Sequence, residues 1–410
     1  MILRRESISM SDYDYSLPDE RIAKHPLPER DTSRLLVERK GEITDAHFRD
    51  IVHLLPKDTL LVFNNSRVLP ARIHFRRETG SIIEIFCLSP VGGNYETALD
   101  RRDCSVWYCL VGNGKRWKDG SLEQRLRVEQ QEILLSAFRE NTDEGYSRIL
   151  FSWDNPALTF GEVLDVAGQL PLPPYLNRDA EPQDSYTYQT VYSRIKGSVA
   201  APTAGLHFTP HIFESLDATD ISREEITLHV GAGTFRPVRG DCISTHLMHA
   251  EYFTVSFSTL ENLLKALGNI VAVGTTTVRT LESLYYLGAC AFEGSFHHPS
   301  PFNPELSHVP QWIPYETVSN RLSVTESLQA LLNYMATRQL TSLSASTQII
   351  ILPTYRPHIA QGLITNFHQP RSTLLLLIAA YTHNWRNLYN HALANDYRFL
   401  SYGDACLFLP

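Results

Sequence analysis

The sequence of 410 residues has no long hydrophobic run and no familiar cysteine pattern. A membrane-spanning helix needs about 20 consecutive apolar residues, whereas the longest run here is TLLLLIAAY at 373–381, which predicts a buried helix. The first ten residues lack the apolar stretch of a secretory signal. The six cysteines are scattered without a C-x-x-C pair, which argues against a zinc knuckle or a disulfide framework. We therefore expect a cytoplasmic protein with reduced thiols and no contact with a membrane.

The sequence also lacks the excess of basic residues that marks many nucleic-acid-binding domains. Its net charge is −8, from 37 Lys and Arg against 45 Asp and Glu. A local basic patch is still compatible with this charge, because phosphate binding depends only on the residues that touch phosphate. The best such patch is NGKRWK at 113–118, where Lys115, Arg116 and Lys118 flank Trp117. It is either a charged turn or a phosphate contact with aromatic stacking.

The order of helix and strand signals predicts an α/β core with an inserted β domain. In residues 1–71 and 154–410 the two signals alternate, which is typical of an α/β domain with a partly parallel or mixed sheet. Residues 72–153 hold short strand candidates between turns, which indicates a small antiparallel β-barrel or sandwich. The one helical pattern in that part is QEILLSAFRE at 131–140. Residues 292–346 are rich in Pro, His and Ser and are expected to form an irregular excursion within the core.

Capping residues predict where several helices of the core begin. Thr209 followed by Pro210 has the residue types of an N-cap and a first helical position. Ser258 and Ser323 each stand three residues before a Glu, which is the spacing of a capping box.

Small residues are mixed with polar ones in three stretches that lie beside predicted strands. In open α/β sheets ligands bind at the carboxyl ends of the strands, and the N-terminus of a following helix offers free N–H groups. The stretches are GSVAAPTAGLHFT at 197–209, HVGAGTF at 229–235 and VGTTTVRTLES at 273–283. In the last one, Gly274 and three hydroxyl residues precede a helix that carries Arg279 and Glu282. A tight turn and an exposed ion pair are the plain alternatives.

Two further stretches are dense in polar side chains. HLMHAEYF at 246–253 contains His246, His249 and Glu251, but neither a helix nor a strand puts all three side chains on one face. Histidines that line a site, or serve the structure, are therefore expected in preference to metal ligands. TNFHQPRST at 365–373 precedes the apolar run, either as a functional loop or as a simple connection into a core helix.

Taken together, these stretches resemble the S-adenosylmethionine:tRNA ribosyltransferase-isomerase family. The matching blocks follow the family's order from about residue 11 to residue 406. They are DYSLPDERIAKHPLPERDTSRLLV, LLVFNNSRVLPAR, GSVAAPTAGLHFT, TLHVGAGTFRPV, HLMHAEYF, AVGTTTVRTLES, LITNFHQPRSTLLLLIAAY and YRFLSYGDA. The resemblance implies an α/β core with an inserted β-barrel and a monomeric protein. It also implies no metal and no bound cofactor, because S-adenosylmethionine is a consumed substrate in this family.

The resemblance further implies the reaction and the parts that it needs. The ribosyl group of S-adenosylmethionine would be transferred to 7-aminomethyl-7-deazaguanine at the wobble position of a tRNA and isomerised. The products would be epoxyqueuosine-tRNA, adenine and methionine. A base is needed beside the acidic 5′ carbon, and His207 and His229 are the candidates. Arg279 would bind the methionine tail, and Glu282 is placed with it in the catalytic group.

The substrate contacts that the matching blocks imply are Pro202, Thr203, Ala204, Gly205, Phe208, Gly231, Gly233, Thr234, His246, His249, Gly274, Thr275, Thr276, Asn366, His368 and Arg371. Lys115, Arg116 and Lys118 are expected to contact tRNA phosphates.

Near its last motif the sequence departs from the usual pattern of this family. Thr354 stands where members usually have Gly, Gln361 where they have Asp, and Gln369 where they have Leu. Two other functions remain as alternatives. Another S-adenosylmethionine-dependent tRNA-modifying enzyme, such as a methyltransferase, would release S-adenosylhomocysteine. A non-catalytic tRNA-binding protein would release no adenine.

Overall fold

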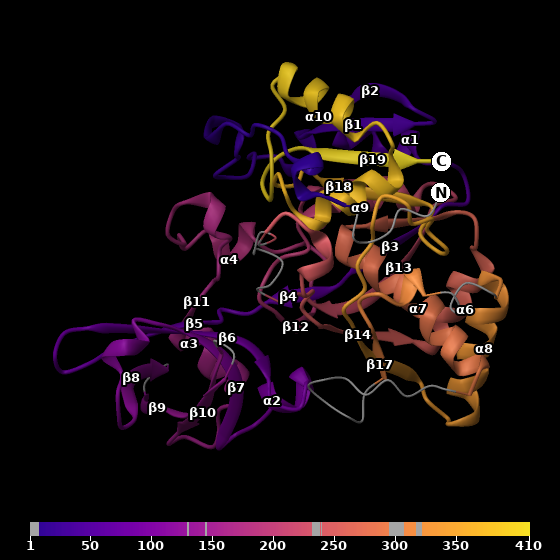
Figure 1. Cartoon of the computed structure of the whole chain (residues 1–410). Coiled ribbons are helices and arrows are strands. Elements are labelled where there is room, and N and C mark those ends of the chain that lie inside the picture. The colour runs from indigo at the N-terminus through magenta and orange to yellow at the C-terminus, as the bar shows by residue number, and fades with distance from the viewer. Residues whose placement is uncertain are drawn as a thin grey trace.

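The structure is a computed structural model that describes residues 8–128, 131–143, 146–231, 238, 240–294, 307–316 and 322–410. Figure 1 shows a large α/β body and, at the lower left, a smaller body built on an antiparallel sheet. Between them lies a two-stranded parallel ribbon of β4 (Ser66–Val68) and β12 (Ile195–Ser198).

A ten-stranded mixed sheet forms the centre of the large body, in the order β16-β17-β14-β13-β3-β15-β18-β19-β1-β2. The neighbours β13, β3, β15 and β18 are parallel, and β19 runs antiparallel to β18. The predicted α/β core with a mixed sheet is therefore confirmed. In chain order the strands are β1 (Arg34–Arg39), β2 (Glu42–His47), β3 (Leu60–Asn64), β13 (Ser222–His229), β14 (Glu251–Ser256), β15 (Ile270–Val273), β16 (Ser307–Val309), β17 (Ser342–Thr347), β18 (Gly362–Asn366) and β19 (Ala405–Leu409).

Helices cover both faces of this sheet, so successive residues of a central strand enter different cores. In β3, Leu60 and Val62 pack toward α6, α7, α8, α9 and α10, whereas Leu61 and Phe63 pack toward α1 and α5. The strands β3, β15 and β18 are consequently buried at every position. These helices are α1 (Ile51–Leu54), α5 (Pro210–Asp217), α6 (Phe257–Lys265), α7 (Thr275–Phe292), α8 (Val324–Thr337), α9 (Thr373–Tyr381) and α10 (Trp385–Ala394).

The smaller body is a seven-stranded antiparallel sheet in the order β11-β5-β6-β7-β10-β9-β8. The sheet curls so that β8 approaches β5, and its apolar side chains form a hydrophobic cluster with those of α3. The helix expected at 131–140 is wrong, because those residues belong to a strand that pairs with both β8 and β10. The elements are β5 (Arg72–Arg76), β6 (Ile82–Pro90), α2 (Tyr95–Leu99), β7 (Cys104–Gly112), β8 (Leu122–Val128), β9 (Gln131–Asp143), β10 (Tyr146–Trp153), α3 (Phe160–Ala167), β11 (Gly168–Gln169) and, in the connection that follows, α4 (Asp184–Thr187).

Two of the expected helix starts are confirmed and one is wrong. Thr209 caps α5 by accepting a hydrogen bond from the Ile212 amide, with Pro210 as the first helical residue. Ser323 caps α8 in a capping box. The cap of α6 is Ser256 and not Ser258, because β14 runs directly into the helix and Ser256 accepts the bond from the Thr259 amide.

In the parts that the structure describes, residues 292–346 contain a strand that was not expected and the helix that was. The strand β16 pairs with β17 at the edge of the large sheet, and the expected helix, α8, packs on α7. The ranges 295–306 and 317–321 lie outside the described residues.

The apolar run at 373–381 forms the helix α9, and its residues 375–379 are buried in the core as expected. In the described parts of the chain, no helix has both the length and the apolar character that crossing a membrane requires.

Two helical glycines provide a matched test of how closely the helices pack. A Cβ at Gly288 would lie 2.2 Å from the carbonyl oxygen of Ser327 in α8, whereas a Cβ at Gly161 would lie an ordinary 3.6 Å from the Leu99 carbonyl oxygen. We expect Gly288→Ala to lower the free energy of unfolding by about 1–3 kcal/mol through overpacking. Gly161→Ala should leave it unchanged or raise it by up to about 1 kcal/mol. Urea unfolding measures both, and equal effects would contradict the close approach of α7 and α8.

Candidate active site

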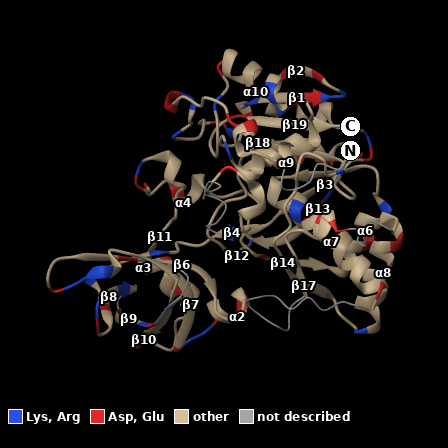
Figure 2. Ribbon diagram, in the orientation of Figure 1, with Lys and Arg blue, Asp and Glu red and all other residues tan. Residues whose placement is uncertain are grey.

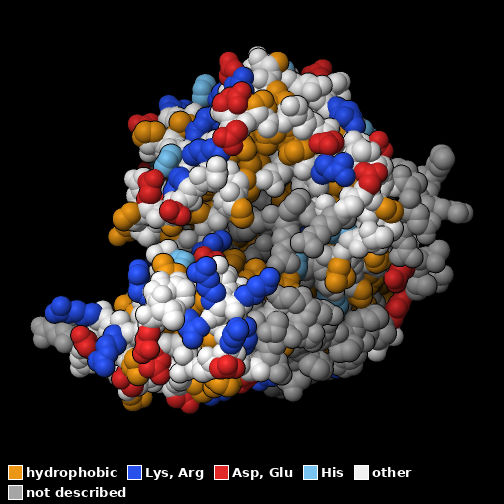
Figure 3. All heavy atoms as spheres, turned by 60° about the vertical axis from the view of Figure 1, so that its left-hand side comes forward, with side chains coloured by type: hydrophobic (Ala, Val, Ile, Leu, Met, Phe, Trp, Pro, Cys, Tyr) orange, Lys and Arg blue, Asp and Glu red, His pale blue; other side chains and the backbone are white. Residues whose placement is uncertain are grey.

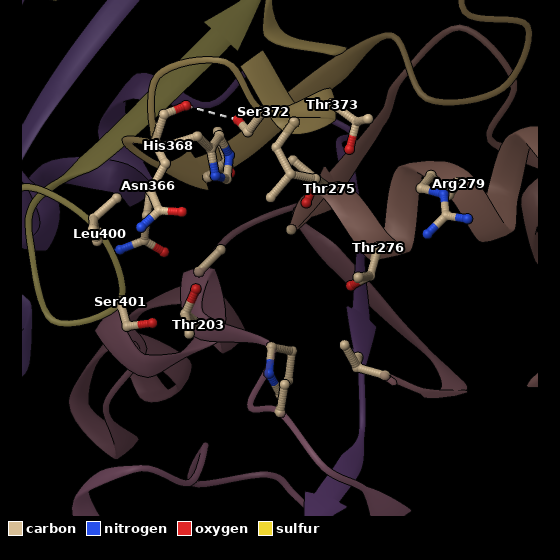
Figure 4. Close-up of a pocket in the computed structure, with 18 of the residues that line it drawn as sticks. Thr203, Thr275, Thr276, Arg279, Asn366, His368, Ser372, Thr373, Leu400 and Ser401 are labelled. Carbon is tan, nitrogen blue, oxygen red and sulfur yellow. Dashed lines mark hydrogen bonds between the residues drawn. The ribbon is translucent and has the colours of Figure 1, made fainter. Parts of the chain in front are cut away.

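A pocket opens where β15 and β18 end and α7 and α9 begin. Its walls come mainly from segments that are far apart in the sequence, at 200–204, 246–251, 274–279, 365–374 and 400–401. Figure 4 shows side chains from the segments at 200–204, 274–279, 365–374 and 400–401 around one common space. The pocket therefore lies at the carboxyl ends of parallel strands, as expected for a ligand site in an open α/β sheet.

Most of the polar and small-residue stretches of the sequence meet at this pocket. The predicted residues that line it are Pro202, Thr203, Ala204, His246, His249, Gly274, Thr275, Thr276, Arg279, Asn366 and His368. Gln369, Ser372, Tyr175 and Ser401 also line it but are absent from the predicted contacts. The first two belong to the loop TNFHQPRST and could have been included with it. Ser401 lies in the matching block YRFLSYGDA, from which no contact is predicted. Tyr175 comes from a segment that only the fold brings to the pocket.

Two helix N-termini face the pocket. Gly274 adopts φ 95°, a conformation that glycine favours, and its amide donates to the Ile364 carbonyl at 2.8 Å, which ties β15 to β18. Thr275 and Thr276 then form the first turn of α7. At α9 the Ser372 hydroxyl caps the helix by accepting from the Leu375 amide at 3.2 Å. The free N–H groups and dipoles of these two helices favour a negatively charged ligand group in the pocket.

The small residues of GSVAAPTAGLHFT serve two purposes. Residues 200–204 form one wall of the pocket. The two glycines instead make room for neighbouring side chains: a Cβ at Gly197 would lie 2.1 Å from Nδ1 of His229, and one at Gly205 would lie 1.9 Å from the Tyr192 hydroxyl. Part of the stretch therefore approaches the pocket, and part of it packs within the protein.

Arg279 is a buried cation on the pocket wall. Its Nε donates to the Ile349 carbonyl at 3.0 Å, and its Nη1 forms an ion pair with the Glu251 carboxylate. The two side chains are only 7% and 2% exposed, so the pair is shielded from water. The Nη2 atom is also buried, and it has no hydrogen-bond partner within the described part of the chain. An anionic group of a ligand would satisfy this donor.

Asn366, the last residue of β18, connects the pocket to His207. Its Nδ2 lies 3.0 Å from Nε2 of His207, whose Nδ1 lies 2.7 Å from the Ser33 hydroxyl. His207 does not line the pocket itself; it is 4% exposed and stacks on Phe48. Burial, with smaller contributions from the charges of Arg398 and Arg30, lowers the pKa of His207 to about 3. The ring is therefore neutral at pH 7.

The histidines that line the pocket are His246, His249 and His368. Burial lowers the pKa of His246 and lowers that of His368 to about 3, so both rings are neutral at pH 7. The His368 ring contacts the Thr365 hydroxyl at 2.9 Å. Among the described residues, no group of three or more His, Cys, Asp or Glu side chains could hold a metal ion.

Like His207, two further expected catalytic residues, His229 and Glu282, lie away from the pocket lining. His229, at the end of β13, is half-buried and stacks on Tyr95 of the smaller body with 4.1 Å between ring centres. Its pKa is lowered to about 4 by burial. The i,i+3 spacing of Arg279 and Glu282 suggested an ion pair between them, but the two side chains do not form one. The Glu282 carboxylate accepts hydrogen bonds from the Tyr355 hydroxyl and from the amides of residues 358–360, at 2.6–3.0 Å. The Glu282 carboxylate therefore fixes the loop at 358–360 against α7.

Several expected substrate contacts are not brought to the pocket lining either. Gly205 faces Tyr192, and Phe208 is packed in the apolar core among aromatic rings. Arg371 is bound to Asp241 and Asp14. Gly231 does not belong to the lining. The remaining two, Gly233 and Thr234, lie outside the described residues.

The basic cluster at 113–118 lies on the smaller body. Lys115, Arg116 and Lys118 are exposed, but Trp117 is buried and its indole nitrogen donates to the Gly120 carbonyl at 3.0 Å. Arg139 stacks on the same ring at 4.4 Å. Base stacking on Trp117 is therefore wrong, whereas phosphate contacts of its charged neighbours stay a prediction. Figure 2 shows further Lys and Arg positions along the ribbon of this body, including its outer end beside β8.

The chain matches a known protein family over most of its length. A family model described as "Queuosine biosynthesis protein" matches residues 10–302 and 318–408. The chain belongs to this queuosine biosynthesis family. The family resemblance inferred from the sequence blocks is thereby confirmed.

Individual relatives of this family member match it over nearly their whole length. The S-adenosylmethionine:tRNA ribosyltransferase-isomerase of Desulfitobacterium hafniense is 37% identical over 413 residues, which cover 98% of this chain and 100% of that protein. The protein of the same name from Anaeromyxobacter sp. is 35% identical over 411 residues, covering 98% and 99%. The crystal structure of S-adenosylmethionine tRNA ribosyltransferase from Thermotoga maritima is 29% identical, covers 97% of this chain and 100% of that one, and has a TM-score of 0.46.

Replacing the Glu282 carboxylate separates a structural role from a catalytic one. Glu282→Gln replaces one carboxylate oxygen by an NH₂ group, which cannot accept the two hydrogen bonds that this oxygen accepts in the wild type. The free energy of unfolding should therefore fall by about 2–4 kcal/mol. At a temperature where the variant is folded, its turnover should stay close to that of the wild type. Glu261→Gln on the exposed face of α6 is the control and should change neither quantity. A Glu282→Gln protein of normal stability without turnover would instead place this carboxylate in the chemistry.

Proposed function

We propose that this protein is an S-adenosylmethionine:tRNA ribosyltransferase-isomerase. It transfers the ribosyl moiety of S-adenosylmethionine to 7-aminomethyl-7-deazaguanine at the wobble position of a tRNA and isomerises it. The products are epoxyqueuosine-tRNA, adenine and methionine. The observation that carries this proposal is the 35–37% identity over nearly the full length to proteins of that name. The polarity of the pocket agrees with it.

The positive end of the pocket suits the methionine part of S-adenosylmethionine. The Nη2 atom of Arg279 and the N-termini of α7 and α9 are all available to a carboxylate. Because the Arg279–Glu251 pair is buried, the guanidinium is held in one orientation, and the ligand does not have to order it.

Proton abstraction from the 5′ carbon needs a neutral base in the pocket. The geometry favours His246 over His207 and His229, because His246 lines the pocket and is neutral, whereas the other two do not line it. In addition, neither ring nitrogen of His207 is free, since Ser33 and Asn366 occupy both. We therefore assign proton abstraction to His246.

The division of the protein into two bodies suits the binding of a small molecule together with a large tRNA. We propose that residues 72–153 form an inserted β-barrel domain on a core of residues 1–71 and 154–410. The curled sheet and its hydrophobic cluster support an inserted domain, and α3 and β11 extend that sheet and cluster to residue 169. The pocket would take S-adenosylmethionine and the wobble base, while the rest of the tRNA would lie across both bodies. Figure 3 shows a hollow between the bodies, with Lys and Arg side chains gathered on the side of the smaller body that borders it. We further propose a cytoplasmic monomer that needs no metal or bound cofactor.

Product analysis tests the proposed function directly. The protein is mixed with S-adenosylmethionine and an anticodon stem-loop that carries 7-aminomethyl-7-deazaguanine. We expect free adenine by chromatography and the matching gain of mass on the RNA, while the same stem-loop with guanine gives neither. S-adenosylhomocysteine as the product would instead mean a methyltransferase. Binding of the RNA without any product would mean a non-catalytic tRNA-binding protein.

The contribution of the basic cluster to tRNA binding is tested by charge reversal. Changing Lys115, Arg116 and Lys118 to Glu should weaken tRNA binding and reduce the slope of log Kd against log salt by about 1 for every phosphate that these cations touch. The matched control reverses three exposed cations of the large body, Lys40, Lys57 and Arg338. Equal salt slopes for the two triple variants would show that the cluster does not touch phosphate.

A further inference from the structure

The buried side chains of Ser33, His207 and Asn366 form a chain of hydrogen bonds that ends at the pocket. Asn366 is 2% exposed and lies at the end of β18, where it is paired with Ala405 of β19, so its backbone is fixed on a central strand. His207 is held by stacking on Phe48, with 4.9 Å between ring centres. The chain therefore connects a rigid ring to a rigid strand, and of its three members only Asn366 reaches the pocket wall.

The direction of each hydrogen bond follows from the chemistry of the groups. The amide nitrogen of Asn366 can only donate, so Nε2 of His207 accepts. The proton of the neutral ring is then on Nδ1, which donates to the Ser33 hydroxyl. A protonated ring would have to donate from Nε2, and the Asn366 amide would have to turn around. Burial and the charge of Arg398 oppose such protonation, because both lower the pKa of His207.

This arrangement leaves the other end of the amide without a partner. Oδ1 of Asn366 is buried, and no described group donates a hydrogen bond to it. In Figure 4 the Asn366 side chain lies with Thr203, His368 and Ser401 around the same space. Buried polar atoms of this kind are uncommon in proteins, because each costs free energy unless a partner arrives. A ligand with an N–H donor would supply that partner.

We propose that His207 is a positioning residue that fixes the Asn366 amide with Oδ1 toward the pocket, where it accepts a hydrogen bond from an amino group of a substrate. The inference rests on the proposed function, in which both substrates offer such donors. S-adenosylmethionine carries the amino groups of its adenine and of its methionine part, and the modified base carries its aminomethyl group and its 2-amino group. Arg279 supplies a donor and Asn366 an acceptor, so the pocket can orient a substrate that has both kinds of group.

The test compares variants at the two ends of the His207–Asn366 hydrogen bond. Asn366→Ala removes the acceptor. His207→Phe keeps a ring against Phe48 but releases the amide. Asn366→Asp is isosteric and keeps an oxygen toward the pocket, since the ring can donate to the other oxygen from Nε2. The matched control is His308→Phe, because His308 is also buried between a serine hydroxyl and a side-chain amide, those of Ser346 and Gln348, but does not line the pocket.

Two dissociation constants are measured separately for each variant, by calorimetry for S-adenosylmethionine without RNA and by fluorescence anisotropy for the modified stem-loop without S-adenosylmethionine. We expect Asn366→Ala and His207→Phe to raise the same constant by about tenfold, the loss of one hydrogen bond. The double variant should be no weaker than Asn366→Ala alone. Asn366→Asp should bind more tightly than Asn366→Ala, and His308→Phe should leave both constants unchanged. The constant that changes identifies which substrate supplies the amino group.

Multiplying effects in the double variant, or an Asn366→Asp protein as weak as Asn366→Ala, would overturn the positioning role. The second comparison does not need His207→Phe to fold. If wild-type protein binds the substrates and Asn366→Ala changes neither constant, the inference fails while the proposed function stands. If the wild-type protein binds neither substrate, the proposed function fails with it.

Discussion

The helix α7 is buried along residues 275–289, so its two charged side chains need partners inside the protein. Arg279 finds Glu251 on β14, and Glu282 finds a hydroxyl and the amides of the loop at 358–360. These two sets of contacts tie the helix to β14 of the sheet on one side and to the segment that leads into β18 on the other. The walls of the pocket therefore depend on the compensation of charge on this one helix.

The same compensation gives the pocket its polarity. Glu251 neutralises Arg279 but leaves one of its nitrogens without a partner among the described residues, and the neutral ring of His207 occupies only one end of the Asn366 amide. A donor and an acceptor are thus both fixed on the pocket wall before any ligand enters. Fixed polar groups of this kind bind a ligand without the loss of side-chain freedom that flexible groups would suffer. They also leave buried polar atoms that are satisfied only in the complex.

Local patterns in the sequence predict much of the fold and the position of the pocket. The strand, Gly274 and helix of VGTTTVRTLES follow from short-range rules, as do the start of α5 at Thr209 and the antiparallel strands of the smaller body. The helix predicted at 131–140 is wrong. The spacing of its apolar residues is compatible with a helix, but pairing with β8 and β10, which the local sequence does not show, makes this segment the strand β9.

Partners that lie far along the chain could not be predicted from the sequence. Glu282 and Arg279 are three residues apart, yet each is bound to groups that only the fold brings near. The burial of Trp117 beneath Arg139 and the contact of His207 with Ser33 are of the same kind. The eight sequence blocks contain most of the segments that line the pocket, but they did not distinguish side chains that face the pocket from those, such as Phe208, that pack in the core behind its walls.

Binding of S-adenosylmethionine in the pocket between the N-termini of α7 and α9 is central to the proposed function. A crystal structure with an unreactive analogue, in which a C–NH₃⁺ group replaces the sulfonium, tests it most directly. We predict that the carboxylate of the analogue lies within hydrogen-bond distance of Nη2 of Arg279, with the ligand in contact with residues 274–276. Density for the analogue outside this pocket, or a carboxylate that does not approach Arg279, would contradict this prediction.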